Sequence, residues 1–380
     1  MTAGGNPRPA LKALLVMPLG TALGGGEQML SQLLRCGRGA GIEWIVVFLR
    51  SGPMVDDARA LGVESHVIDA GRFRNVLRRA AAIRRIAALA RDRGADLCFG
   101  WMVAGQVTAG LAALVARLPC VWYQVGTPRP DWLDRIATAL PARGILVLSR
   151  AGEAAQRRVW PPRAIRLVYP GIAFDAFDRV RGMSPADLRT KLGLPATGPL
   201  VGIVGRLQRW KGVHVFIDAI AIVRRERPDV HAVVVGGPHE TEPRYGDELR
   251  ARSLSCGVAD AVTFAGFQRN AADWMQAMDV VVHASDNEPF GIVVIEAMAL
   301  GKPVVAGAAG GPSEIVTDGT NGLLAPWGDA NALASAILRY LSDPDLGARL
   351  GAAARVRAAD FSEESYARNV VSATRELLAR

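Results

Sequence analysis

Short apolar runs alternate with helical patterns along almost the whole chain. Six runs of strand length occupy the first half, and six more follow after a polar stretch. Strands that alternate with helices in this way are typical of parallel sheets with helices on both faces. The predicted strands are 13–17, 44–49, 65–68, 97–99, 121–124 and 145–148, then 200–204, 232–235, 262–264, 280–283, 303–306 and 323–325.

The polar stretch marks the predicted domain boundary. Residues 172–199 are rich in turn-forming residues, and 380 residues are enough for two domains of ordinary size. The pattern predicts an α/β protein with two Rossmann-like domains that face each other across a cleft. The predicted parts are an N-terminal domain at 1–172, a linker at 173–198, a C-terminal domain at 199–361 and a final helix within 362–380.

The fourth strand of the second series leads into a predicted anion site. Residues 280–305 read VVVHASDNEPFGIVVIEAMALGKPVV: an apolar strand, a Pro-Phe-Gly turn and a helix. The first N–H groups of a helix have no acceptor within it and point out of its N-terminus, where they can bind a phosphate. Here these groups belong to Gly291, Ile292 and Val293.

Two glutamates flank this turn. Glu296 is predicted to lie in the first helical turn, where a carboxylate is favoured by the helix dipole and can accept hydrogen bonds from vicinal ribose hydroxyls. Glu288 precedes the turn and could bind a second polyol. A phosphate site between two such carboxylates predicts a nucleotide diphospho-sugar as the ligand. A pair of helix-capping carboxylates without a ligand is the alternative.

A basic loop follows the first strand of the second series. Residues 205–212 read GRLQRWKG, in which glycine permits close approach of the backbone. Arg206 and Lys211 can place two cations on a diphosphate; a solvated basic turn is the alternative. The predicted base pocket comprises Gly236, Gly266 and Phe267.

Together these motifs resemble those of a known family. The pattern E-P-F-G-x-x-x-x-E at 288–296, followed by A-M-A-x-G-K-P-V-V, is similar to the E-x(7)-E motif of retaining glycosyltransferases of family 4. These enzymes have the GT-B fold of two facing Rossmann-like domains. The resemblance extends to the basic loop at 205–212, to G-G-P-S-E at 310–314, to G-L at 322–323 and to G-G-G-E at 24–27, in the family's order along the chain.

The resemblance implies a function and roles for residues. It implies a retaining glycosyltransferase that moves a sugar from a nucleotide diphospho-sugar to a lipid-linked or saccharide acceptor, in envelope polysaccharide synthesis. Arg206 and Lys211 would neutralise the leaving diphosphate, and Glu288 would bind the donor sugar. These three are the predicted catalytic residues, while Glu296 would bind the ribose and Phe290 would join the donor site. The final helix would cross back onto the first domain.

The glycine-rich loop and one glutamine form a second predicted site. Gly25, Gly26 and Glu27 open a helix and could bring backbone N–H groups to an acceptor or donor phosphate; a tight turn is the alternative. Many family members have a histidine at the end of the strand at 121–124, where this chain has Gln124. A glutamine can hydrogen-bond a sugar hydroxyl but cannot carry a proton at neutral pH.

The first half of the chain is basic. Residues 1–172 hold 23 Lys and Arg against 11 Asp and Glu, whereas residues 173–380 hold 22 against 25. This asymmetry predicts contact with an anionic membrane surface or a phosphorylated acceptor, with an Arg-rich composition throughout the chain as the alternative. In the predicted helix at 72–93 the apolar face is expected to pack on the sheet and the arginines to face outward. The apolar face comprises Val76, Ala80, Ile83, Ala87 and Ala90, and the outward arginines are Arg74, Arg78 and Arg85.

We expect neither a cofactor nor a metal, and the donor base, UDP or GDP, stays open. The one D-x-D pattern, at 343–345, is predicted to be a turn and helix cap. Four cysteines without a C-x-x-C pair predict reduced thiols in a cytoplasmic protein. The basic first half adds the prediction that this protein is peripheral on the inner face of the membrane. We expect no nucleic-acid partner. A nucleotide-sugar epimerase and a nucleotide-binding oxidoreductase are the alternatives, and the latter lacks its G-x-G-x-x-G pattern.

Overall fold

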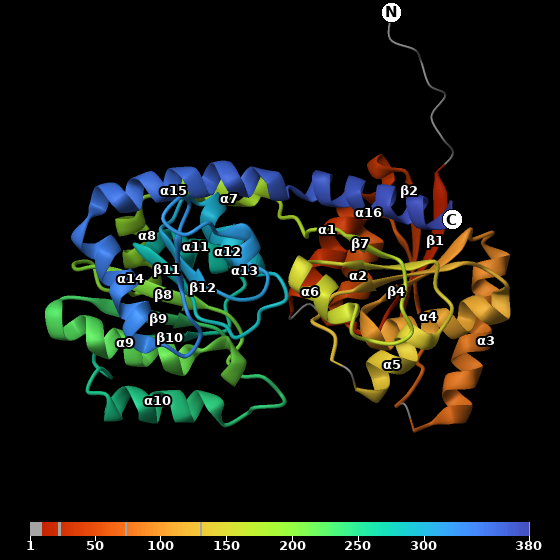
Figure 1. Ribbon diagram of the computed structural model, residues 1–380, viewed down its shortest axis with the longest axis horizontal. Coiled ribbons are helices and arrows are strands. Elements are labelled where there is room, and N and C mark those ends of the chain that lie inside the picture. The colour runs from red at the N-terminus through yellow and green to blue at the C-terminus, as the bar shows by residue number, and fades with distance from the viewer. Residues whose placement is uncertain (1–9, 22–23, 73, 130, 380) are drawn as a thin grey trace, which may run out of the picture. The chain divides into compact units, whose positions relative to one another are not determined.

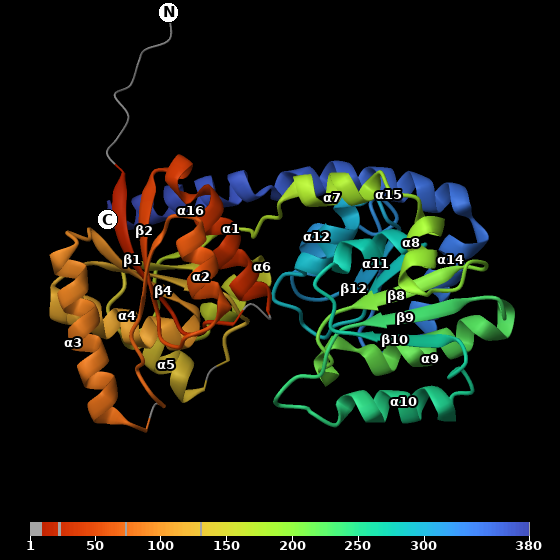
Figure 2. The ribbon, with the colours of Figure 1, turned by 180° about the vertical axis from the view of Figure 1, so that it is seen from behind.

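The computed structural model describes residues 10–21, 24–72, 74–129 and 131–379. The chain divides into two compact units, one formed by Met1–Gly171 with Glu363–Arg380 and the other by Ile172–Ser362. Each unit contains a parallel sheet with helices packed on it (Figures 1 and 2), so the predicted α/β class is confirmed. Among the described helices, none is long and apolar enough to cross a membrane.

The sheet of the first unit has seven strands among the described residues, in the order β3-β2-β1-β4-β5-β6-β7. The last strand was not predicted, because it has only three residues and one of them is an arginine. The strands are β1 (Leu11–Met17), β2 (Ile42–Phe48), β3 (Glu64–Val67), β4 (Leu97–Trp101), β5 (Cys120–Gln124), β6 (Gly144–Val147) and β7 (Ile165–Leu167).

Helices cover both faces of this sheet. On one face α3, α4 and α5 pack in series, and Leu14 and Val16 of β1 belong to their apolar core. On the other, Tyr366 of α16 lies against Tyr123 of β5, with ring centroids 6.3 Å apart. The helices are α1 (Gly25–Ala40), α2 (Pro53–Ala60), α3 (Val76–Asp92), α4 (Met102–Ala116), α5 (Trp132–Ala139), α6 (Arg150–Gln156) and α16 (Glu363–Leu378).

The C-terminal helix α16 is bound to the first unit by ion pairs as well as by its apolar face. Arg35 of α1 donates to Glu363 at 2.8 Å, and Arg166 of β7 donates to Glu376 at 2.8 Å. The buried Tyr366 adds an apolar contact with Tyr123 of β5. The end of the chain is therefore part of the first unit.

The inward face of α3 differs from the prediction. Ala87 and Ala90 are buried as expected, but Val76 is 71% exposed and Ile86 takes the inward place. Arg79 also turns inward and donates to the hydroxyl of Thr108 on α4 at 3.0 Å. The first turn of α3 therefore extends beyond the sheet. The repeat of small apolar residues along the helix cannot reveal where its contact with the sheet ends.

The sheet of the second unit has six strands among the described residues, in the order β10-β9-β8-β11-β12-β13. The two central strands, β8 and β11, are neighbours, although a long stretch of chain separates them. The strands are β8 (Leu200–Val204), β9 (His231–Val235), β10 (Val262–Gly266), β11 (Val280–His283), β12 (Val304–Gly307) and β13 (Leu323–Ala325).

Helices also cover both faces of the second sheet. The long helices α9 and α14 pack on each other, and α12 packs on α15. The helices are α7 (Phe174–Arg181), α8 (Pro185–Leu192), α9 (Val213–Glu226), α10 (Tyr245–Ser255), α11 (Ala271–Ala277), α12 (Ile292–Ala299), α13 (Pro312–Ile315), α14 (Ala330–Ser342) and α15 (Pro344–Ala358), with short 3-10 turns η1 (Arg209–Lys211) and η2 (Ala359–Phe361).

The segment predicted to be a linker is folded. Residues 173–198 contain α7 and α8 and belong to the second unit. Arg189 of α8 is buried and donates to Asp279 at 2.7 Å, which fastens the helix to the start of β11. Pro185 is one of the turn-forming residues of this stretch, but it is the first residue of α8, a position where helices accept proline.

Candidate functional site

The site in the second unit lies at the carboxyl ends of β8 and β11. The chain leaves β8, forms η1 and enters α9 through Gly212, whose φ of +70° favours glycine. A Cβ atom on Gly212 would collide with the carbonyl oxygen of Ala284, directly after β11. The glycine thus lets the end of η1 lie against the loop after β11, and Lys211 comes with it.

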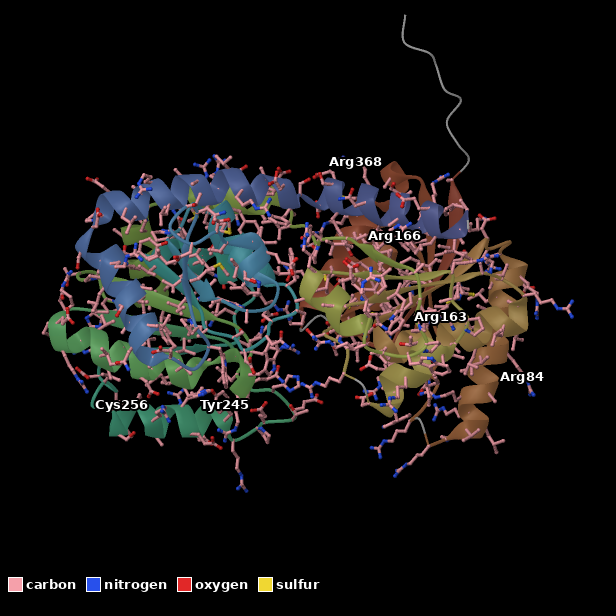
Figure 3. The ribbon with its side chains drawn as sticks, viewed as in Figure 1. Arg84, Arg163, Arg166, Tyr245, Cys256 and Arg368 are labelled. Atoms are coloured by element: carbon pink, nitrogen blue, oxygen red, sulfur yellow. The ribbon has the colours of Figure 1, made fainter. Side chains whose placement is uncertain are left out.

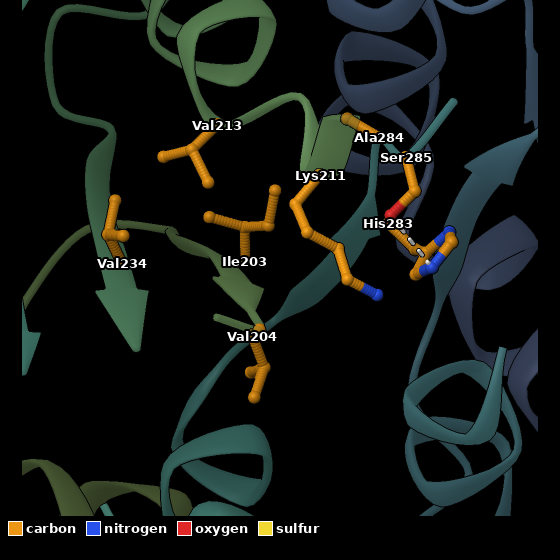
Figure 4. Close-up of a pocket in the computed structure, with 9 residues that line it drawn as sticks. Ile203, Val204, Lys211, Val213, Val234, His283, Ala284 and Ser285 are labelled. Atoms are coloured by element: carbon orange, nitrogen blue, oxygen red, sulfur yellow. Dashed lines mark hydrogen bonds between the residues drawn. The ribbon is translucent and has the colours of Figure 1, made fainter. Parts of the chain in front are cut away.

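An ion pair joins the two predicted motifs. Lys211 Nζ lies 2.5 Å from Glu288 Oε2, and both side chains are largely buried, with 16% and 12% of their surface exposed. The imidazole Nε2 of His283, the last residue of β11, lies 3.3 Å from the same oxygen. Lys211, His283 and Ser285 line one small pocket with apolar side chains of β8 and β9 (Figure 4).

The Glu288 carboxyl group is held in its ionised form. Burial by itself raises the pKa of this group, but the nearby Lys211 ammonium and the hydrogen bond with His283 outweigh burial. The pKa of Glu288 therefore lies well below its usual range. At neutral pH the site offers a carboxylate that can accept hydrogen bonds from hydroxyl groups.

The loop that contains Glu288 is supported from behind by the G-G-P-S-E motif. Gly311 N–H donates to the carbonyl oxygen of Glu288 at 2.8 Å. Gly310 has a φ of +72°, and a Cβ atom there would collide with the backbone of Glu288. Asn287 itself has a φ of +39°, a conformation that asparagine tolerates better than most residues. The motif recognised in the sequence is thus a backbone support for the carboxylate.

The helix after this loop starts as predicted, but Glu296 does not lie where we expected. Gly291, with a φ of +105°, precedes α12, so the N–H groups of Gly291, Ile292 and Val293 lie at its N-terminus. Glu296 is the fifth residue of α12, in its second turn, and is 8% exposed. The argument from the helix dipole for Glu296 was therefore wrong, because that effect is confined to the first turn.

Phe290 has a core position. Its side chain is 2% exposed, and its ring centroid lies 5.7 Å from that of Phe361. It anchors the loop between Glu288 and α12 to the body of the second unit.

The two cations of the basic loop differ in their surroundings. Arg206 is half-buried, and its side chain makes neither a hydrogen bond nor an ion pair with the described residues. Arg209, three residues later, is paired with Glu248 and lies over the ring of Tyr245. Arg206 is therefore the cation of this loop that is available to an anion without breaking an existing contact.

The predicted base-pocket residues come together beside this loop. Gly236 N–H donates to the carbonyl oxygen of Gly266 at 2.9 Å, across the ends of β9 and β10. A Cβ atom on Gly236 would collide with the carbonyl oxygen of Gly205, so glycine is required for the close approach of β8 and β9. Phe267 follows Gly266 and leaves 57% of its surface exposed. An exposed aromatic ring next to glycines is suited to stacking on a planar base.

The predicted residues of the first unit also cluster, at the carboxyl ends of β1, β4 and β5. Gly26 lies in the first turn of α1, where its carbonyl oxygen accepts from Trp101 Nε1 at 3.1 Å. A Cβ atom on Gly26 would lie 2.4 Å from Cε of Met102 and 2.9 Å from a methyl group of Val125, so packing favours glycine at this position. Glu27 is buried beside it. Gln124 is buried and donates through Nε2 to Asp134 at 2.9 Å.

Burial raises the pKa of Asp134, although hydrogen bonds from the Arg129 N–H and from Gln124 oppose the shift. The fixed amide of Gln124 leaves its oxygen for a ligand hydroxyl. Sequence reasoning missed Asp134, and it interpreted His283 as a packed core residue of its strand. A histidine five residues before Glu288 in the same strand and loop was the available signal for the latter.

The first carboxylate of the D-x-D pattern is structural. Asp343 accepts a hydrogen bond from the Leu346 N–H at 2.9 Å and caps α15, so the predicted helix cap is confirmed. Among the described residues, the cluster with three side chains suited to a metal consists of Cys36, Glu363 and Glu364 in the first unit.

Each of the two α/β units has a sheet of parallel strands, and the second unit has a cation–carboxylate pair beside a helix N-terminus. These features define a protein of the GT-B class. Residues 186–357 match the family described as glycosyl transferases group 1. The match lies within the second unit, and the fold expected from the sequence motifs is confirmed.

Known proteins resemble the chain over different spans. A D-inositol 3-phosphate glycosyltransferase of Streptomyces scabiei is 35% identical over 223 residues, which cover 57% of this chain and 50% of that protein. The chain spans about half the length of the curated relatives it matches. The crystal structure of Anabaena Alr3699/HepE in complex with UDP is 27% identical with a TM-score of 0.85, and the match covers 96% of this chain and 100% of that one. The same protein with UDP-glucose gives a TM-score of 0.84.

Proposed function

We propose that this chain is a glycosyltransferase that takes its sugar from a UDP-sugar. The observation that carries the proposal is the contact between Lys211 and Glu288. In a nucleotide diphospho-sugar the sugar is bonded directly to the second phosphate. The cation that binds this phosphate and the carboxylate that binds the sugar hydroxyls must therefore be neighbours, as these two residues are. The structures of Alr3699/HepE with UDP and UDP-glucose support uridine as the base.

The residues of the site have distinct tasks in this proposal. Arg206 and Lys211, with the N-terminus of α12, stabilise the negative charge that develops on the leaving diphosphate. Glu288 accepts hydrogen bonds from the donor sugar, Glu296 binds the ribose, and the base stacks on Phe267. The resemblance to the retaining enzymes of family 4 supports attack by the acceptor on the side of the leaving group, with retention of the anomeric configuration and with neither carboxylate acting as a nucleophile. Proton NMR of the product anomer tests this, and an inverted linkage would refute it.

The test of the proposed function is donor hydrolysis by the full chain across a panel of UDP- and GDP-sugars. We expect slow release of UDP from one or more UDP-sugars and none from GDP-sugars above the background. Glu288→Gln is the matched control, because it keeps the size of the side chain but removes its charge. Nucleotide release from no member of the panel, or equal release by the Gln variant, would argue against the proposal.

The transfer reaction is expected to be independent of divalent metal ions. Arg206, Lys211 and the helix terminus supply positive potential at the diphosphate, a task that a metal ion performs in other enzymes. Turnover should therefore stay within about twofold of its initial value after treatment with EDTA, an effect too small to count as lost transition-state stabilisation. Loss of turnover that Mg²⁺ or Mn²⁺ restores would contradict this expectation.

We further propose that the acceptor is lipid-linked, as in envelope polysaccharide synthesis, and that the first unit docks on an anionic membrane. Two helices that follow β3 and β5 start with exposed apolar side chains, Val76 and Leu77 on α3 and Trp132 on α5. Helices that follow parallel strands start at the carboxyl edge of the sheet, where α1 and its glycine loop also start. Arg84 projects outward from α3 (Figure 3). Apolar side chains among arginines are suited to the interface of an anionic bilayer.

Binding to anionic vesicles is expected to be peripheral and sensitive to salt. Each arginine near the surface contributes about 1 kcal/mol, and the attraction decays within a Debye length of about 8 Å at physiological ionic strength. Arg78 is paired with Asp69 at 2.8 Å, so Arg74 and Arg85 should contribute more than Arg78. Sedimentation with vesicles should show weaker binding for Arg74→Glu with Arg85→Glu, and for Leu77→Ser, than for wild type. The absence of binding at low salt would contradict the proposed membrane contact.

A further inference from the structure

The ion pair of Lys211 and Glu288 has a third member whose position is fixed by the sheet. His283 is the last residue of β11, which is paired with β8 on one side and β12 on the other. Its side chain is 4% exposed, and Ser285 Oγ lies 3.2 Å from its Nε2 (Figure 4). A side chain held in this way can fix the orientation of a partner.

The contacts of Glu288 are concentrated on one oxygen. Lys211 Nζ and His283 Nε2 both bind Oε2, at 2.5 Å and 3.3 Å. Within the described part of the chain, Oε1 accepts no hydrogen bond. The two oxygens of a carboxylate are equivalent, so two donors on one of them fix the orientation of the group and the direction in which the other oxygen meets a ligand.

The hydrogen bond also decides the tautomer of His283. A carboxylate only accepts, so the proton of this contact must be on Nε2. The other ring nitrogen, Nδ1, is buried and has no partner among the described residues. Nδ1 then has a lone pair and no proton. This tautomer fits the surroundings of Nδ1, because an N–H group there would find no acceptor.

We propose that His283 is a positioning residue of the donor site: its Nε2–H holds Oε2 of Glu288, so that Oε1 receives a hydroxyl of the donor sugar. This inference rests on the proposed donor function. It predicts that His283 affects binding of the sugar and leaves binding of the nucleotide unchanged, because Arg206 and the N-terminus of α12 do not depend on it. A merely structural role would change both or neither.

Two variants that differ by one methylene test the proposal. Gln places its amide nitrogen near the position of Nε2, whereas the amide nitrogen of Asn is near that of Nδ1 and cannot reach Glu288. Calorimetric titration of the full chain with UDP and with UDP-glucose should give unchanged UDP affinity in wild type, His283→Gln and His283→Asn. The affinity for UDP-glucose should stay within about threefold in the Gln variant and fall about 10- to 100-fold in the Asn variant, as expected for the loss of a hydrogen bond to a charged group.

The outcomes separate the inference from the function on which it rests. Two outcomes would show that the positioning role is wrong while the donor site stands, provided that wild type binds UDP-glucose. In the first, the Asn variant binds UDP-glucose as well as wild type does. In the second, it loses affinity for UDP to the same extent as for UDP-glucose. If wild type binds neither ligand, both are wrong. Nitrogen-15 NMR of histidine-labelled wild type provides a second test. It needs only one variant, His283→Gln, which serves to assign the signal of His283. The signal of His283 should show the proton on Nε2, and a bare Nε2 would overturn the proposal.

Discussion

Replacing Lys211 by methionine is expected to cause the largest loss, in both donor binding and stability. The substitution leaves the Glu288 carboxylate largely buried without its main counter-charge, and an uncompensated buried charge is costly. We expect the free energy of unfolding to fall by about 2–3 kcal/mol and the affinity for UDP to fall about 10- to 100-fold. Urea unfolding and calorimetry with UDP measure the two effects.

The double variant Lys211→Met with Glu288→Gln separates these effects. A neutral glutamine no longer needs the ammonium group, so most of the lost stability should return while the affinity for UDP stays low. Lys191→Met is the matched control, because its ion pair with Asp273 lies in the same unit and the lysine is 59% exposed. Asp273 is itself 10% exposed, but it also accepts a hydrogen bond from the Asn270 amide at 3.3 Å, so Lys191→Met should lose less stability than Lys211→Met. Equal stability of the single and double variants would show that the pair does not hold the site together.

The same pair gives the wild type a defined pH dependence. The pKa of Glu288 is lower in the folded state than the ordinary value of 4.5, so its contribution to stability is complete above that value. The contribution is lost as the pH falls towards the folded-state pKa, since both states are then protonated. The stability difference between wild type and the double variant should shrink below about pH 4.5 and stay constant from there to neutral pH.

Arg206→Ala is expected to have the second largest effect, and on binding alone. Arg206 makes no ion pair with the described residues, so its removal should change the free energy of unfolding by less than about 0.5 kcal/mol. Loss of a cation from the diphosphate should lower the affinity for UDP about 10- to 100-fold. Calorimetry and urea unfolding again provide the measurements.

Arg209→Ala is the matched control in the same loop. Arg209 is already paired with Glu248 and lies over Tyr245, so it is committed to α10 and its removal should leave the affinity for UDP nearly unchanged. If the two arginine variants lose affinity for UDP equally, the loop acts by its overall charge, and the assignment of Arg206 to the diphosphate is wrong.

Local patterns were sufficient where a few adjacent residues decide the structure. The run from Val280 to Gly301 contains an apolar strand, a turn and a helix start, and the structure has β11 and α12 there. The turn of a helix in which a given residue lies was less certain. The predicted helix already began at Ile292, as α12 does, but a turn holds only about 3.6 residues, so Glu296 as the fifth residue falls in the second turn.

Contacts between distant segments could not be read from the chain. Lys211 and Glu288 are 77 residues apart, and only the pairing of β8 with β11 brings the loops after them together. The same applies to Gln124 with Asp134 and to the support of Glu288 by Gly311. A side chain can be assigned a chemistry from its own motif, but its partner depends on the order of strands in the sheet.

The sequence by itself determined the class of fold, the two cations and two carboxylates of the donor motifs, and the glycines that their loops require. These features follow from local periodicity and from residue chemistry within short segments. Only the tertiary structure decided that Lys211 is paired with Glu288, that Arg206 has no partner in the described part of the chain, and that His283 belongs to the site. The physical reason is that hydrogen bonds and ion pairs act over a few ångströms in space, and distance along the chain says little about distance in the folded sheet.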